Sequence, residues 1–230
     1  MELIVNRLNK CYGTKQVLKD VSYQFKSGTI YSILGRNGAG KTTFFNCLSR
    51  QSSYDSGSIF LLEHGIEKAV EYDDIAMVSA SPQLPDYLTG YEFVYYFTKL
   101  NPDDREKLDI DAYFDLVQID IPDRHRLIKD YSYGMKNKLQ LLCCLVRNPA
   151  IILLDEPLSS FDVIVSHQIK NLLLDIKEDH IILMSTHILQ LAQDISDKIL
   201  LLHNCQIQDP HFTDYHSADF ENAVIEALEK

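Results

Sequence analysis

Long hydrophobic runs and tryptophan are both missing from this sequence of 230 residues. The longest apolar runs, such as Leu141–Val146 and Phe93–Phe97, fall far short of the roughly 18 residues that a membrane-spanning helix needs. The first residues, MELIVNRLNK, lack the charged and then apolar pattern of a signal peptide. We therefore expect neither a spanning helix nor a secreted protein.

Cysteine is scarce, and its placement excludes a disulfide scaffold. The five cysteines are odd in number, scattered along the chain, and form no CxxC pair. This usage is typical of a cytosolic protein whose reduced thiols act as small hydrophobic residues. The five positions are Cys11, Cys47, Cys143, Cys144 and Cys205.

Positive charge is also in short supply. The chain has 22 Lys and Arg residues against 33 Asp and Glu, which gives a formal net charge of −11. A general binder of nucleic acid or anionic lipid needs the opposite balance. We therefore expect no nucleic-acid partner, while a local basic site remains compatible with this composition. The hydrophobic fraction of 46% is ordinary for a globular domain.

Apolar strands alternate with helical segments along most of the chain. The first 35 residues, Ser58–Leu62 and Ile75–Ser79 are predicted to be strands, and a helix is predicted to begin at Lys41. Past residue 150 the predicted order is strand, helix (Val163–Lys177), strand, helix, strand. This order predicts an α/β fold with a mainly parallel sheet and an N-terminal antiparallel β subdomain.

A helical insert and an acidic tail complete the predicted organisation. Residues 84–147 have helical spacing and are predicted to form a subdomain inserted in a domain of residues 1–208. The tail, residues 209–230, holds six acidic residues and one lysine. Phe220, Val224 and Leu228 form one apolar stripe and predict a helix over Ala218–Leu228. This stripe either packs on the chain's own core or faces a partner.

A glycine-rich loop between a strand and a helix predicts phosphate binding. Gly35–Thr42 reads GRNGAGKT and matches GxxxxGK[ST] at every fixed position. Glycines let several backbone N–H groups face one anion, and the following helix adds its positive end. Lys41 is expected to contact the outer phosphates and the Thr42 hydroxyl to bind Mg²⁺. The dinucleotide fingerprint GxGxxG fails, because Thr43 replaces its third glycine.

The second half of a nucleotide site follows an apolar strand. Ile151–Leu154 runs directly into Asp155 and Glu156. Asp155, at the strand end, is placed to hold a magnesium ion. Glu156, one residue later, is placed to orient or deprotonate a water molecule.

Together these residues resemble the nucleotide-binding subunit of ATP-binding cassette (ABC) transporters. The resemblance runs from about Leu3 to Ile207 and rests on motifs in the family's order. It implies an adenine-stacking residue at Tyr12, a Q-loop glutamine at Gln83 and a switch histidine at His187. It also implies a signature segment at Tyr131–Met135 and a D-loop at Ser159–Asp162.

The resemblance implies ATP and Mg²⁺ as cofactors, and it assigns three groups of residues. The catalytic residues would be Glu156, His187, Gln83 and Lys41. The metal-binding residues would be Thr42, Gln83 and Asp155. The nucleotide-binding residues would be Tyr12, Gly35, Asn37, Gly38, Ala39, Gly40, Lys41, Thr42, Thr43, Ser132 and Gly134.

The signature segment departs from the family pattern LSGGQ. Ser132 and Gly134 are kept, but Tyr133 replaces a glycine and Met135 replaces the glutamine. The family uses this segment to contact a γ-phosphate, and the bulky side chain of Tyr133 is expected to change the affinity of that contact. The form Ser-x-Gly-Met-Lys resembles cassettes that pair with separate membrane subunits of exporter type, which favours export over import.

The family mechanism implies partners and a location. Two cassettes, either two copies of this chain or this chain and a related one, would close head to tail over ATP. Ser132 and Gly134 would then act on the nucleotide of the partner cassette. A separate transmembrane permease subunit would hold the chain at the cytoplasmic face of the cell membrane. Substrate choice in this family usually lies in that subunit, so nothing here specifies the cargo.

Three alternatives remain open at this point. A non-transport ABC ATPase is disfavoured because no sustained heptad lies between Lys41 and Asp155 and only one cassette is present. A regulatory ABC module with weak hydrolysis is disfavoured by the presence of Glu156 and His187. A P-loop kinase would need an acceptor site and a lid in place of a signature-type segment.

Overall fold

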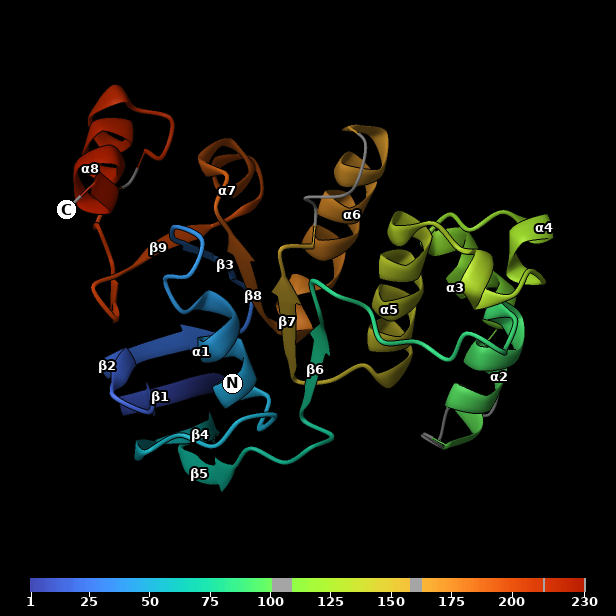
Figure 1. Cartoon of the computed structure of the whole chain (residues 1–230), viewed down its shortest axis with the longest axis horizontal. Helices are drawn as coiled ribbons and strands as arrows, with labels where there is room; N and C mark the ends of the chain where they lie inside the picture. Colours follow the sequence, from blue (N-terminus) through green and yellow to red (C-terminus); the bar gives the residue numbers. More distant parts are fainter. Residues whose placement is uncertain (101–108, 158–162, 213, 230) are drawn as a thin grey trace.

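The computed structural model describes residues 1–100, 109–157, 163–212 and 214–229 and contains two β-sheets with helices around them (Figure 1). The smaller sheet is antiparallel, with strand order β2-β1-β4-β5. Its strands are β1 (Glu2–Tyr12), β2 (Lys15–Lys26), β4 (Ser56–Glu63) and β5 (Ile66–Ala69). The predicted antiparallel subdomain at the N-terminus is therefore confirmed.

The larger sheet has strand order β10-β9-β3-β8-β7-β6. All neighbours pair in parallel except β9 and β10, so the prediction of a mainly parallel sheet is also confirmed. The strands are β3 (Ile30–Leu34), β6 (Ile75–Val78), β7 (Ile151–Asp155), β8 (Ile181–Thr186), β9 (Lys198–His203) and β10 (Gln206–Gln208).

Helices surround the two sheets. They are α1 (Lys41–Leu48), α2 (Gly90–Leu100), α3 (Ile110–Leu116), α4 (Ile121–Arg124), α5 (Tyr133–Arg147), α6 (Val163–Ile176), α7 (Leu189–Ile195) and α8 (Ala218–Glu229), with short 3₁₀ turns at Ile128–Asp130 and Lys177–Asp179. In the parts of the chain that the structure describes, none of these helices combines the length and the apolar character needed to cross a membrane.

Two strands lay outside the sequence-based expectation. The residues of β5 are all exposed, and its two charged residues stand next to each other, so the strand lacks the alternation that marks a half-buried strand. Strand β10 has only three residues, which is too few to show a hydrophobic pattern in the sequence. Both are edge strands, and their pairing depends on a neighbouring strand more than on their own composition.

The central strands of the larger sheet, β3, β7 and β8, are buried at every position and are mostly apolar, so the sheet is covered on both faces there. In β7, Ile151 and Leu153 pack toward α1 and the antiparallel sheet. Ile152 and Leu154 point the other way, toward α5 and α6. This alternation fixes β7 between two cores and places its last residue, Asp155, at the carboxyl edge of the sheet.

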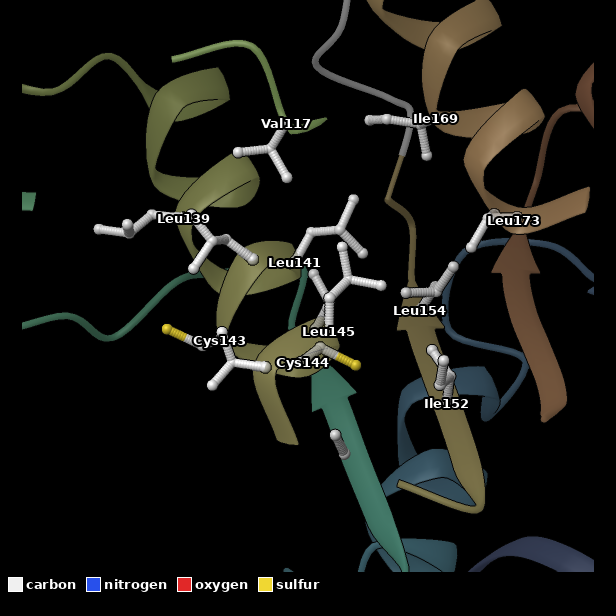
Figure 2. Packing of buried hydrophobic residues seen from close by; sticks show 14 of the residues in the cluster. Val117, Leu139, Leu141, Cys143, Cys144, Leu145, Ile152, Leu154, Ile169 and Leu173 are labelled. Carbon is white, nitrogen blue, oxygen red and sulfur yellow. The ribbon is translucent and has the colours of Figure 1, made fainter. Parts of the chain in front are cut away.

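Helix α5 packs on the larger sheet. Figure 2 shows Leu141 and Leu145 on the side of α5 that faces Ile152 and Leu154 of β7. Cys143 points away from that strand. Burial raises the pKa of the Cys143 thiol, and it raises the pKa of the Cys144 thiol to about 12. All five cysteines are free thiols, as expected. The assignment of residues 84–147 as an inserted subdomain stays a prediction.

The apolar stripe of the tail helix packs on the chain's own core. Phe220 and Val224 of α8 are buried against residues of α7 and β9. Figure 1 shows α8 near the C-terminus, on the side of the molecule where α7 and β9 lie. Burial of a phenylalanine side chain contributes roughly 1.5–3 kcal/mol, which favours the docking of this helix. The side chain of Leu228 lies outside the described part, and the boundary between residues 1–208 and 209–230 stays a prediction.

Candidate functional site

The glycine loop between β3 and α1 has a backbone that other residues cannot adopt without strain. Gly38 and Gly40 have φ angles of 82° and 111°, in the left-handed region. A Cβ on Gly40 would lie 2.9 Å from Cγ1 of Val17, and one on Gly35 would lie 2.7 Å from the carbonyl of Leu202. The glycines therefore give the loop its curvature and its close packing against neighbouring strands.

Lys41 points back into this loop from the first turn of α1. Its side chain is only 6% exposed, and its ammonium donates to the carbonyl of Gly35 at 2.7 Å and to that of Arg36 at 3.3 Å. The ammonium also lies 3.3 Å from a carboxylate oxygen of Glu156. A buried positive charge is thus held at the mouth of the loop, next to Glu156, the residue that directly follows β7.

Asp155 and Thr42 meet across the sheet edge. Parallel pairing of β8 with both β3 and β7 brings the carboxyl ends of these strands together. The Thr42 hydroxyl donates to Oδ2 of Asp155 at 2.8 Å, and Asp155 is 2% exposed. A carboxylate and a hydroxyl oxygen are hard ligands of the kind that Mg²⁺ prefers, so the residues present fit this ion.

Glu156 and His187 lie beside this pair. The Nδ1 atom of His187 is 3.0 Å from Oε2 of Glu156, while the other oxygen of Glu156 faces Lys41. The backbone of Glu156 has a φ angle of +50°, which is uncommon for a residue with a Cβ. This backbone turn directs the Glu156 side chain away from the strand and toward Lys41 and His187.

A cavity of about 340 Å³ lies over the loop and extends to Tyr12. The Tyr12 ring is 51% exposed, and the ammonium of Lys10 lies 4.8 Å from its centroid. An exposed aromatic face at one end and backbone N–H groups with a lysine at the other suit a base joined to phosphates. The lining residues are Tyr12, Lys15, Val17, Asn37, Gly38, Gly40, Lys41, Thr42, Thr43 and Glu156.

Three predicted residues lie away from this cavity, and one predicted segment lies outside the described residues. Gln83 is exposed in the loop between β6 and α2 and is not among the described residues that line the cavity. Ser132 caps α5 by accepting the N–H of Met135 at 3.2 Å, and Gly134 follows it in the first turn of that helix. Neither lines the cavity of its own chain. The predicted D-loop, Ser159–Asp162, lies outside the described residues.

Two residues of this region were not predicted from the sequence. Lys10 is 7% exposed, and its ammonium lies over the ring of Tyr12. The sequence feature that could have revealed it is a lysine that follows the apolar residues on the buried face of β1. Ser185 lies within the buried strand β8 and contacts both Asp155 and Glu156. The sequence feature that could have revealed Ser185 is a hydroxyl side chain inside the apolar run IILMST.

Comparison with known proteins places the chain in one family. The family model described as ABC transporter matches residues 18–159. The bacitracin transport ATP-binding protein BcrA of Enterococcus faecalis is 27% identical over 88% of this chain and 67% of its own length. The phosphonates import ATP-binding protein PhnC of Fusobacterium nucleatum is 30% identical over 88% of this chain and 89% of its own length.

A solved structure shares the fold. A dimeric ATP-binding cassette in a post-hydrolysis state, bound to ADP and Pi, superposes with a TM-score of 0.77 at 21% identity, over 90% of this chain and 96% of that one. Together with the family match over more than half of the sequence, this likeness means that the chain belongs to the ABC transporter family and has its P-loop cassette fold.

Proposed function

We propose that this chain binds ATP with Mg²⁺ over the glycine loop, hydrolyses it, and uses the cycle to drive transport by a separate membrane subunit. One observation carries the proposal. Lys41, Thr42, Asp155, Glu156 and His187 come from three separate segments of the chain. They form two neighbouring sets of contacts beside the phosphate loop, Thr42 with Asp155, and Glu156 with Lys41 and His187.

Each of these side chains has a role in phosphoryl transfer to water. Lys41 would stabilise negative charge on the outer phosphates, and Glu156 would orient or deprotonate the attacking water. His187, hydrogen-bonded to Glu156, would hold that carboxylate and contact the γ-phosphate. Thr42, Asp155 and Gln83 would hold Mg²⁺, which when bound neutralises charge on the phosphate oxygens. Tyr12 would stack on the adenine.

The opposite end of the site would come from a second cassette. Ser132 and Gly134 lie at the start of α5, whose N-terminal end is suited to meet a γ-phosphate, yet they do not line their own chain's cavity. Head-to-tail closure with a second copy or a related cassette would bring them over the nucleotide. The dimeric state of the structural neighbour supports this arrangement.

Coupling to transport requires a transmembrane permease subunit, which would hold the chain at the cytoplasmic face of the membrane. The similarity to a bacitracin transport protein and to a phosphonates import protein supports transport in either direction. The signature form favours export, so export is the direction that we propose to test first.

The proposal is tested by Mg²⁺-dependent phosphate release from ATP by the purified full chain. Release of inorganic phosphate that requires Mg²⁺ and leaves no phosphorylated acceptor is expected. A phosphorylated acceptor would instead support a kinase. Binding of ATP without release, even with the membrane subunit in vesicles, would favour a regulatory module.

A further inference from the structure

Ser185 is a buried hydroxyl between the two acidic residues of the site. In the parallel register of β7 and β8 it lies directly opposite Asp155. It is fully buried, in a strand whose other residues are buried as well. A hydroxyl at such a position must find partners within the protein, because burial of an unpaired hydroxyl is unfavourable.

Both hydrogen-bonding functions of this hydroxyl are used by the site. Oγ of Ser185 donates to Oδ1 of Asp155 at 2.5 Å. The same oxygen accepts the backbone N–H of Glu156 at 3.0 Å. One atom of β8 therefore contacts the side chain of the first acidic residue and the backbone of the second.

The first of these bonds fixes the orientation of a carboxylate. With Oδ1 held by Ser185, the other oxygen, Oδ2, is the one that faces Thr42. Rotation of the carboxylate would break the bond to Ser185 and the bond to Thr42 together. Hydrogen bonds from outer groups to ligating carboxylates commonly control the affinity and the activity of metal sites.

The second bond fixes the backbone from which the Glu156 side chain departs. Glu156 has a positive φ angle, a conformation that persists only where the surroundings hold it. The bond from its N–H to Ser185 is one such constraint, and it ties the direction of the Glu156 side chain to the position of Asp155.

We infer that Ser185 is a positioning residue of the hydrolysis site, which sets the metal-facing oxygen of Asp155 and the direction of Glu156 through one hydroxyl. This inference rests on the proposed ATPase function and deepens it. Ser185 does not touch the cavity, so it acts through Asp155 and Glu156 and not on the nucleotide itself.

The test compares Ser185→Ala and Ser185→Thr with Ser32→Ala. Ser32 is the matched control, because it is also fully buried in the same sheet, on β3, and its hydroxyl bonds to Ser196 away from the site. The full chain is assayed for kcat and KM for ATP, for the Mg²⁺ concentration at half-maximal rate, and for ATP affinity without Mg²⁺. Melting temperatures show whether each variant folds.

Loss of the hydroxyl is expected to lower kcat about tenfold and to raise the half-saturating Mg²⁺ concentration about tenfold. ATP affinity without Mg²⁺ is expected to stay within twofold of wild type, and Ser32→Ala is expected to keep wild-type kinetics. Ser185→Thr keeps the hydroxyl and is expected to retain more than half of kcat. If Ser185→Ala does not fold, Ser185→Cys, a similar side chain with a weak donor, replaces it.

Three results would overturn the inference. The first is kinetics of Ser185→Ala within twofold of wild type, and the second is an equal loss of kcat in Ser185→Ala and Ser185→Thr. An equal loss in Ser32→Ala would assign the effect to general packing and overturn it as well. If wild-type protein itself shows no Mg²⁺-dependent hydrolysis, the proposed function fails, which is a different outcome from an active wild type with an insensitive Ser185.

Discussion

At the scale of single residues, Lys41 and Tyr12 mark the two ends of the cavity. Lys41 is surrounded by oxygen atoms from two loop carbonyls and from Glu156. A phosphate would take the place of some of these oxygens as the partner of the ammonium. Tyr12 offers an exposed ring whose position is supported by Lys10. Substitutions of Lys41 and of Tyr12 are therefore expected to affect the binding of different parts of the nucleotide, the phosphates and the base.

Lys41→Ala is expected to weaken ATP binding at least about tenfold, because a charge-assisted hydrogen bond to phosphate is lost. A titration with a fluorescent ATP analogue measures the change. Lys26→Ala, at an exposed lysine of β2 that pairs with Glu2, is the control and should leave affinity unchanged. If the Lys41→Ala protein binds the ATP analogue with wild-type affinity, the assignment of the phosphate loop is wrong.

Tyr12→Ala is expected to raise KM for ATP about fivefold or more with little change in kcat, since stacking on a base is lost while the catalytic groups stay in place. Steady-state phosphate release measures both constants. Tyr12→Phe keeps an aromatic ring and should keep KM near the wild-type value. A fall in kcat with unchanged KM would contradict a stacking role.

At the scale of elements, the segment that leads into α8 is tied to the core by one polar cluster. Asp209 accepts the hydroxyl of Tyr23 at 3.2 Å and pairs with Lys198 at 3.2 Å. Burial raises the pKa of Tyr23 to about 12, with Asp209 adding to the shift. Burial opposes ionisation of Asp209, but hydrogen bonds from the backbone of His211 and from Lys198 lower its pKa overall.

A lowered pKa in the folded state means that ionised Asp209 stabilises the fold above the ordinary carboxyl pKa of about 3.9, and that this contribution is lost as the pH falls through the folded-state value. Asp209→Asn is therefore expected to lower the melting temperature at pH 7, with a difference from wild type that shrinks below about pH 4. Thermal unfolding across pH measures it. Glu226→Gln, at an exposed position of α8, is the control. A pH-independent difference would refute this role.

At the scale of the whole molecule, the proposed function divides the nucleotide site between two separate parts of each chain. The phosphate loop and Glu156 lie at the carboxyl edge of the sheet, whereas Ser132 lies at the start of α5 in the helical region. ATP between two such chains would contact both halves, and hydrolysis would remove that contact. A ligand shifts an equilibrium only through such a difference in contacts.

Glu156→Gln is expected to bind ATP, to elute as a dimer in its presence, and to lose at least about tenfold in turnover, because the base is removed while the binding groups remain. Size-exclusion chromatography and phosphate release measure these effects. ADP in place of ATP is the control and should leave the protein monomeric. Unchanged turnover would show that Glu156 lacks the proposed role.

The sequence by itself determined the features that are local in the chain. Glycine spacing before Lys41, and an apolar strand ending in Asp155, are readable from a few consecutive residues, since backbone curvature and strand burial depend on immediate neighbours. The alternation of strands and helices likewise predicted the mainly parallel sheet. The short edge strands β5 and β10 escaped prediction because their pairing is decided by other strands.

Only the tertiary structure decided which distant residues support the site. Ser185 reaches Asp155 through the register of two parallel strands, and Lys10 reaches the Tyr12 ring through the inward face of β1. The choice between packing and partner contact for Phe220 was likewise settled by its neighbours on α7 and β9. Register and packing join residues far apart in the chain, and the free energy of such contacts depends on both partners, so no local pattern encodes them.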